Sequence, residues 1–191
     1  MNKFRELTAA EIDCRVSTVS AKGCSLLLYK DARCDMNILD ETVGPQNWKR
    51  SHETINGNLF CNVSIYDEDK GEWITKQDVG VESYTEKEKG QASDAFKRAC
   101  FNWGIGRELY TAPFIWISAE DVTLSDKDNH GQRKFTTYDR FAVEQILYEN
   151  GVIVALSILN TSLRRRVFKY DIRKKENDGI TGKDQGNHKG Y

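Results

Sequence analysis

Apolar residues recur at spacings of three and four between residues 92 and 103, the pattern of a helix with one apolar face. The residues on this face are Ala92, Ala95, Phe96, Ala99, Cys100 and Trp103. At 100° per residue they form a stripe wide enough to pack on a sheet. Thr85 and Glu88 fit a capping box, and Gly104 suits the left-handed residue that ends a helix. The pattern predicts a helix over residues 86–103.

Three stretches upstream of this helix have the pattern of strands. They cover residues 48–53, 58–67 and 73–82 and are separated by Asn56-Gly57 and by Asp69-Lys70-Gly71. Both separators are hairpin-turn signals. The sequence therefore predicts three antiparallel strands that lead into the helix and are packed by it.

Two further helices and a strand are predicted nearer the N-terminus. A capping box beginning at Thr8, followed by helical spacing of apolar residues, predicts a helix over residues 9–21. A short apolar run predicts a buried strand over residues 25–30. Asp31 then suits the cap of a second helix that ends at Gly44.

The C-terminal half predicts a second β-meander. Residues 118–134 are polar and have the character of an exposed, mobile loop. Strands are expected over residues 141–148, 152–159 and 166–172, and they either extend the first sheet or pack beside it. Residues 173–191 contain too little apolar area to offset the entropy of ordering, so we expect a disordered tail that could bind a partner. The fold class is α+β, with a single domain over residues 1–172.

Composition restricts the function classes. The chain has 191 residues, with 28 basic and 29 acidic side chains and a net charge of −1, so any phosphate-binding face must come from local patterning. The five cysteines form no CxxC pair, which argues against a disulfide framework and a zinc site and favours reduced, mostly buried thiols. No apolar run approaches the roughly 20 residues of a membrane span, and the N-terminus lacks a signal-peptide core. We expect a soluble cytoplasmic protein with no membrane partner.

Lys97 and Arg98 are the first candidates for nucleic-acid contact. They lie outside the apolar stripe and project roughly 100° apart, with Asp94 nearby to orient the guanidinium. Such a pair can bind a phosphate backbone. The alternative is an ordinary solvated helix face.

A cluster of arginines and one isolated arginine each have two possible interpretations. The strongest local concentration of positive charge begins with Arg164, Arg165 and Arg166, and such a cluster suits sequence-independent phosphate contact. The alternative is a charged hairpin that protects a sheet edge from pairing. Arg107 follows the glycines after the helix and either reaches the same groove as Lys97 or pairs with Glu108 or the last helical carbonyls.

Several segments carry a family resemblance. In chain order they read LLLYKDAR, LDETVGPQNWKRS, GNLFCNVSIYD, GEWITKQDVGVES and KGQASDAFKRACFNWGIGRELY. Over about residues 25–112 they resemble the conserved domain of the Rad fifty-two superfamily of single-strand annealing proteins, as its phage members, the Sak group, carry it.

This resemblance implies a fold and a function. It implies an N-terminal annealing domain that binds single-stranded DNA and anneals complementary strands without ATP, in recombination and repair. It also implies homo-oligomers, in rings or helical assemblies, in a bacterial or phage-infected cytoplasm. Lys97 and Arg98 match the family's inner-groove Lys-Arg pair, and Arg33 in YKDAR aligns with another groove arginine. No catalytic residue, metal or cofactor is expected.

Two alternative functions stay open. Asp78, Glu82, Glu86 and Lys87 loosely resemble the residues of a metal-dependent DNA nuclease, although acids near a helix N-terminus are also favoured by the helix dipole. The second alternative is an adaptor whose tail contacts a single-strand-binding protein or loads a recombinase. The absence of a GxxxxGK[ST] motif argues against ATP-driven strand exchange.

Overall fold

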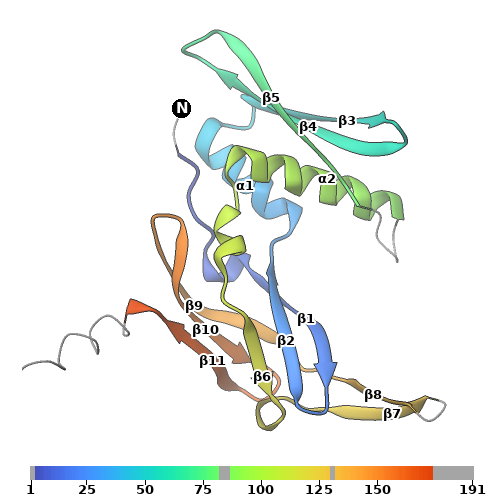
Figure 1. Cartoon of the computed structure of the whole chain (residues 1–191). Coiled ribbons are helices and arrows are strands. Elements are labelled where there is room, and N and C mark those ends of the chain that lie inside the picture. Colours follow the sequence, from blue (N-terminus) through green and yellow to red (C-terminus); the bar gives the residue numbers. More distant parts are fainter. Residues whose placement is uncertain (1–2, 82–86, 130–131, 174–191) are drawn as a thin grey trace, which may run out of the picture.

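A computed structural model of the chain describes residues 3–81, 87–129 and 132–173. A three-stranded sheet with helix α2 against it forms the upper part of the molecule, and a six-stranded sheet forms the lower part (Figure 1). The mixture of antiparallel sheets and two α-helices in the described part of the chain is α+β, as predicted.

The three-stranded sheet and its helix follow the predicted pattern. The elements are β3 (Trp48–Ile55), β4 (Asn58–Asp67), β5 (Glu72–Val79) and α2 (Lys87–Trp103). All strands are antiparallel, in the order β3-β4-β5. Asn56 and Gly57, which form the first hairpin turn, both have positive φ, of 51° and 78°. This is the geometry for which Asn-Gly is favoured.

The apolar stripe of α2 packs on this sheet. Ala95, Phe96, Ala99 and Cys100 are fully buried in a cluster that includes the inward-facing residues of β4. The chain between β5 and α2 approaches the helix so closely that a Cβ on Gly80 would lie 2.2 Å from the carbonyl oxygen of Gln91. A glycine is therefore required where the strand passes the helix.

The six-stranded sheet combines both ends of the chain. Its strands are β1 (Asp13–Ser20), β2 (Gly23–Tyr29), β6 (Ile115–Ser118), β9 (Phe141–Glu149), β10 (Val152–Asn160) and β11 (Arg165–Asp171). The order is β11-β10-β9-β1-β2-β6. The predicted second meander is present as β9 to β11, and it joins β1 rather than the first sheet, through the pairs Asp13↔Ala142 and Cys14↔Phe141.

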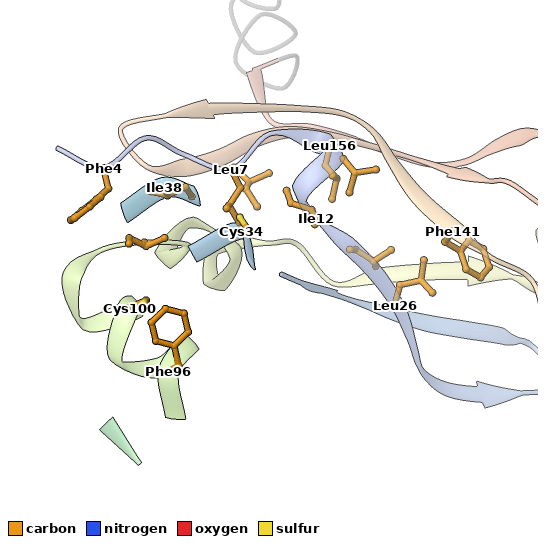
Figure 2. Packing of buried hydrophobic residues seen from close by; sticks show 14 of the residues in the cluster. Phe4, Leu7, Ile12, Leu26, Cys34, Ile38, Phe96, Cys100, Phe141 and Leu156 are labelled. Carbon is orange, nitrogen blue, oxygen red and sulfur yellow. The ribbon is translucent and has the colours of Figure 1, made fainter. Parts of the chain in front are cut away.

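One buried cluster connects the two sheets (Figure 2). Helix α1 (Ala32–Val43) contributes Ile38 and Cys34, and the segment before β1 contributes Leu7. The predicted cap of α1 is confirmed, because the Asp31 side chain accepts hydrogen bonds from the amides of its first turn. The five cysteines are free and four are buried, as predicted.

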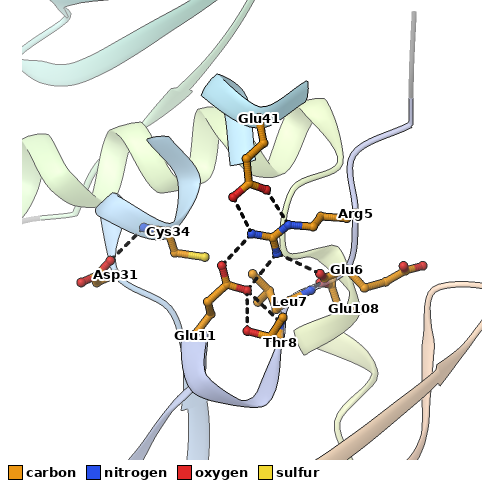
Figure 3. Close-up of polar contacts among 9 residues, drawn as sticks. All are labelled: Arg5, Glu6, Leu7, Thr8, Glu11, Asp31, Cys34, Glu41 and Glu108. Carbon is orange, nitrogen blue, oxygen red and sulfur yellow. Dashed lines mark hydrogen bonds and ion pairs between the residues drawn. The ribbon is translucent and has the colours of Figure 1, made fainter. Parts of the chain in front are cut away.

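The predicted helix over residues 9–21 is wrong. Only a short 3-10 turn, η1 (Ala9–Glu11), forms, and β1 follows it. The local signal was genuine, because Glu11 accepts hydrogen bonds from the amide and hydroxyl of Thr8 (Figure 3). Glu11 is also held by Arg5, which pairs with Glu41 of α1 as well. Beyond that turn, pairing of β1 with β2 on one side and β9 on the other favours an extended chain over a helix.

The predicted mobile loop over residues 118–134 is also wrong. After β6 the chain makes a 3-10 turn, η3 (Ala119–Asp121), and then a hairpin of β7 (Ser125–Asn129) and β8 (Gln132–Thr136). Ser125 lies opposite Thr136 in this hairpin. The hairpin extends away from the six-stranded sheet (Figure 1), so its strands can be polar without the alternation that identifies a half-buried strand.

Parts of two predicted elements lie outside the described residues. These are the capping box at Thr85 and the side chain of Glu88, and the tail from residue 174 onward.

Candidate nucleic-acid interface

A groove of about 480 Å³ lies between α2 and the β2–β6 edge of the six-stranded sheet. Three elements form its walls: α2, the end of β2, and the segment that runs from the 3-10 turn η2 (Arg107–Thr111) into β6. Its cations are Lys30, Lys97 and Arg98, and its aromatic residues are Tyr29, Phe101, Tyr110 and Phe114. A groove with basic and aromatic walls is the arrangement that holds single-stranded nucleic acid.

The two predicted helix cations both line this groove. They lie between the buried pairs Ala95–Phe96 and Ala99–Cys100, on the side of α2 that does not pack on the sheet. Lys97 makes no ion pair within the described part of the chain, and Arg98 makes one long contact, 3.4 Å from Nε to Oδ1 of Asp78. Because the Arg98 side chain is about half exposed, its guanidinium retains donors for a phosphate.

The role predicted for Asp94 is wrong. Its carboxylate accepts a hydrogen bond of 3.0 Å from the backbone amide of Val81, which ties α2 to the end of the preceding strand. Asp78, at the end of β5, contacts Arg98 instead and also accepts a hydrogen bond from the side-chain amide of Asn102. The acid that contacts Arg98 is therefore Asp78 of the edge strand β5, and not Asp94 of the same helix as the sequence predicted.

A buried ion pair lies at the base of the groove, between Lys30 Nζ and Oδ1 of Asp35. The second Asp35 oxygen, Oδ2, is buried and has no hydrogen-bond partner among the described residues. Burial raises the pKa of Asp35 to about 6, and the charge of Lys30 opposes that rise. The Lys30 side chain passes directly over Gly106, where a Cβ would lie 2.3 Å from Lys30 Cε. Gly106, with a φ of 78°, thus leaves space for the lysine as well as making the turn.

The aromatic residues were not identified from the sequence as groove residues. Phe101 packs against Tyr110 with ring centroids 4.6 Å apart, and Phe114 stacks near Trp116 at 6.4 Å. Tyr110 and Phe114 are each 77% exposed. The sequence does place several aromatic residues close together between residues 101 and 116, but their spacing follows neither a helical nor a strand period.

Arg107 has the second of its two predicted roles in this structure. Its Nε donates to the carbonyl of Phe101 at 2.8 Å, and its Nη2 donates to the carbonyl of Asn102 at 2.9 Å. These are last carbonyls of α2, which a basic side chain can cap. Glu108 does not pair with it but accepts a hydrogen bond of 2.7 Å from the Leu7 amide.

Arg33 lies in the first turn of α1 and is not part of the groove wall. Its side chain is 83% exposed and pairs with the capping residue Asp31 at 2.9 Å. The hydrogen bond from the Cys34 amide and the contact with Arg33 lower the pKa of Asp31. The guanidinium is therefore accessible to a ligand, although it is already paired.

Arg164, Arg165 and Arg166 are not brought to the groove. They lie at the end of the six-stranded sheet that is remote from α2 (Figure 1). Arg165 pairs with Asp121 at 3.0 Å. Arg166 makes a bidentate contact with Glu144 on β9, at 2.5 and 2.9 Å, which lowers the pKa of that carboxyl.

The structure describes the residues of the nuclease alternative only in part. Within residues 3–81, 87–129 and 132–173, no three His, Cys, Asp or Glu side chains gather as metal ligands do. Asp78 is engaged with Arg98 and Asn102. Glu82 and Glu86 lie outside the described residues, as does the side chain of Lys87. In the same described ranges, no helix has the length and apolar character needed to cross a membrane.

Comparison with known proteins gives a family. Residues 5–128 match the Rad52/22 family double-strand break repair protein. The chain is 34% identical over 108 residues to the single-stranded DNA-binding protein DdrA of Deinococcus radiodurans, covering 53% of this chain and 49% of that protein. It is 31% identical over 113 residues to the protein of the same name from Deinococcus deserti, covering 56% and 53%.

The chain thus spans about half the length of these relatives. No solved structure matches it. The family match covers η1, both α-helices, the three-stranded sheet and the groove, so it includes every element that positions Lys97 and Arg98. The chain therefore belongs to the Rad52/22 family of double-strand break repair proteins.

Proposed function

We propose that this protein binds single-stranded DNA in the groove between α2 and the β2–β6 edge, and anneals complementary strands in recombination and repair without nucleotide hydrolysis. The observation that carries this proposal is the placement of Lys97 and Arg98 in one groove with exposed aromatic rings. The DdrA relatives are named single-stranded DNA-binding proteins, which supports the same ligand.

Binding would be electrostatic and indifferent to sequence. Lys97 and Arg98 offer ammonium and guanidinium donors to phosphate oxygens, and no base is needed for such contacts. Each neutralised phosphate of a single strand releases counterions, so the affinity falls steeply as salt rises. Annealing then requires only that two held strands meet with their pairing edges accessible.

One groove on a chain of net charge −1 would bind weakly. We propose that protomers assemble side by side, in a ring or a helical array, so that several grooves hold one strand. Linked sites raise the overall affinity through the high effective concentration of each further site. Arg33, Arg164, Arg165 and Arg166 are secondary candidates for contact. Arg33, Arg165 and Arg166 already pair with acidic side chains of the same chain, and Arg164 lies in a hairpin turn with positive φ.

The test is annealing of two labelled complementary oligonucleotides without ATP, at low and high salt, with magnesium present or chelated. We expect rapid annealing of intact strands that is independent of magnesium and sensitive to salt. The variant Lys97→Ala with Arg98→Ala, the groove double variant, should bind single strands more weakly. It should also lower the slope of log affinity against log salt by about 1.4, from two phosphate contacts at about 0.7 each.

A matched control separates the groove from overall charge. Lys22→Ala with Lys70→Ala removes two exposed lysines from the β1–β2 and β4–β5 turns, outside the groove. It should leave the salt slope unchanged. A folded groove double variant with wild-type affinity at moderate salt would refute the proposed site. Strands shortened in the presence of magnesium would support a nuclease instead.

A further inference from the structure

The groove carries more exposed aromatic surface than the fold itself uses. The aromatic band consists of four residues that line the groove, Tyr29, Phe101, Tyr110 and Phe114, and of Trp116, which stacks with Phe114 beside it. Tyr110 and Phe114 are each 77% exposed, and Trp116 and Tyr29 are 38% and 37% exposed. Single exposed apolar side chains are common, but a contiguous group on one surface indicates an interaction site.

The strand register directs this band outward. In β6, Ile115 lies opposite Leu26 and Trp116 lies opposite Ser25. Ile115 and Ile117 point into the core and are buried. Since successive side chains of a strand alternate, Phe114 and Trp116 share the opposite, exposed face. Their rings are inclined by only 17°, so the two present nearly parallel faces.

The band is continuous with the cationic wall. Phe101 of α2 packs on Tyr110, and Lys97, one turn before Phe101, lines the same groove. A second protomer docking an apolar patch here would cover Lys97 and Arg98 without supplying a counter-charge, which is costly. A nucleic-acid strand supplies both an anion for the cations and flat apolar rings for the aromatic side chains.

We propose that the aromatic band stacks against the bases of the strand whose phosphates are held by Lys97 and Arg98. This proposal rests on the proposed function and adds a second set of contacts to the same site. Stacking engages the face of a base and leaves its Watson–Crick edge free. The band would therefore hold bases in an ordered row while keeping them available for a complementary strand, which phosphate contacts alone do not do. Stacking is also tolerant of sequence, because every base has such a face.

The test compares an ordinary oligothymidine with an abasic strand of equal length, which has the sugar-phosphate backbone and no bases. Wild-type protein should bind oligothymidine at least tenfold more tightly than the abasic strand. Tyr110→Ala with Phe114→Ala, the band variant, should lose most of that preference while its affinity for the abasic strand stays unchanged. The groove double variant should weaken binding to both strands.

Tyr138→Ala is the matched control, because Tyr138 is 78% exposed and lies outside the groove. It should behave as wild type. Equal wild-type binding to both strands, or a preference that survives in the band variant, would overturn the base-stacking proposal and leave the proposed function standing. Failure of wild-type protein to bind either strand would overturn both.

Sedimentation of the same proteins tests the competing occupant. We expect the band variant and wild type to have the same oligomeric state. A band variant that dissociates an assembly present in wild type would assign the band to contacts between protomers and refute base stacking.

Discussion

The buried Lys30–Asp35 pair predicts that folding stability falls as pH rises from 5 to 8. The perturbation is Asp35→Asn, which removes the ionisable group and keeps its size. Burial raises the pKa of Asp35 from 3.8 to about 6, since its Oδ2 has no hydrogen-bond donor among the described residues and Lys30 opposes the rise only in part. An acid whose pKa is raised by folding contributes stability below its unfolded pKa, and that contribution is lost as pH rises through the folded value.

The magnitude follows from the two pKa values. The difference between 3.8 and about 6 corresponds to roughly 3 kcal/mol of unfolding free energy between the fully protonated and fully ionised protein. Roughly half of this change falls between pH 5 and pH 8, because the rest is already lost below pH 5. For a domain with a stability of about 5–15 kcal/mol, such a change is readily measured.

The assay is urea unfolding followed by tryptophan fluorescence, at constant ionic strength across pH 5 to 8. Wild type should lose roughly 1 kcal/mol of unfolding free energy across this range, and Asp35→Asn should lack this loss. Glu41→Gln is the control, since Arg5 lowers the pKa of that exposed carboxyl and moves its titration below this window. Parallel profiles for wild type and Asp35→Asn would refute the reasoning.

Three further predictions concern other parts of the fold. Gly80→Ala should destabilise the protein by about 1–3 kcal/mol in urea unfolding, because the added Cβ would meet the backbone of α2; an unchanged midpoint would contradict the close approach. Cys100, whose pKa is raised by burial, should react with iodoacetamide at neutral pH only on unfolding, and mass spectrometry of the labelled native protein would reveal any exception. Arg166→Ala should weaken strand binding less than the groove double variant does, since Arg166 is already held by Glu144; an equal loss in a filter-binding assay would place the strand on both surfaces.

The central part of the fold was predictable from the sequence because its signals are local. The hairpin turn at Asn56-Gly57 and the apolar stripe of α2 each depend on residues a few positions apart, and the structure confirms both. The strand β1 was missed for the opposite reason. Ile12, Val16 and Val19 satisfy helical spacing, but their conformation is decided by pairing with β2 and with the distant β9.

The site was predictable only in part, for the same reason. Lys97 and Arg98 could be identified as candidates because they lie on the polar side of α2, and both line the groove. Lys30 and the aromatic band could not be assigned to the groove, because packing brings residues 29–30, 94–101 and 106–115 together from separate elements. The charge of Arg107 alone could not show whether it contacts DNA or the protein. Its hydrogen bonds to carbonyls at the end of α2 depend on the glycine turn that precedes it.

The pairing of β1 with β9 has a consequence for how the chain folds during synthesis. The family match ends at residue 128, whereas the neighbour of β1 in the sheet begins at Phe141. Until β9 has left the ribosome, β1 is paired only with β2, and Asp13 and Cys14 lack their partners in β9; such an open edge is a template for association with other chains. Contacts between such distant segments also slow folding, since the connecting loop must close before they form. A fragment cut at the family boundary would keep that edge open permanently, and we expect it to aggregate although it retains the whole groove.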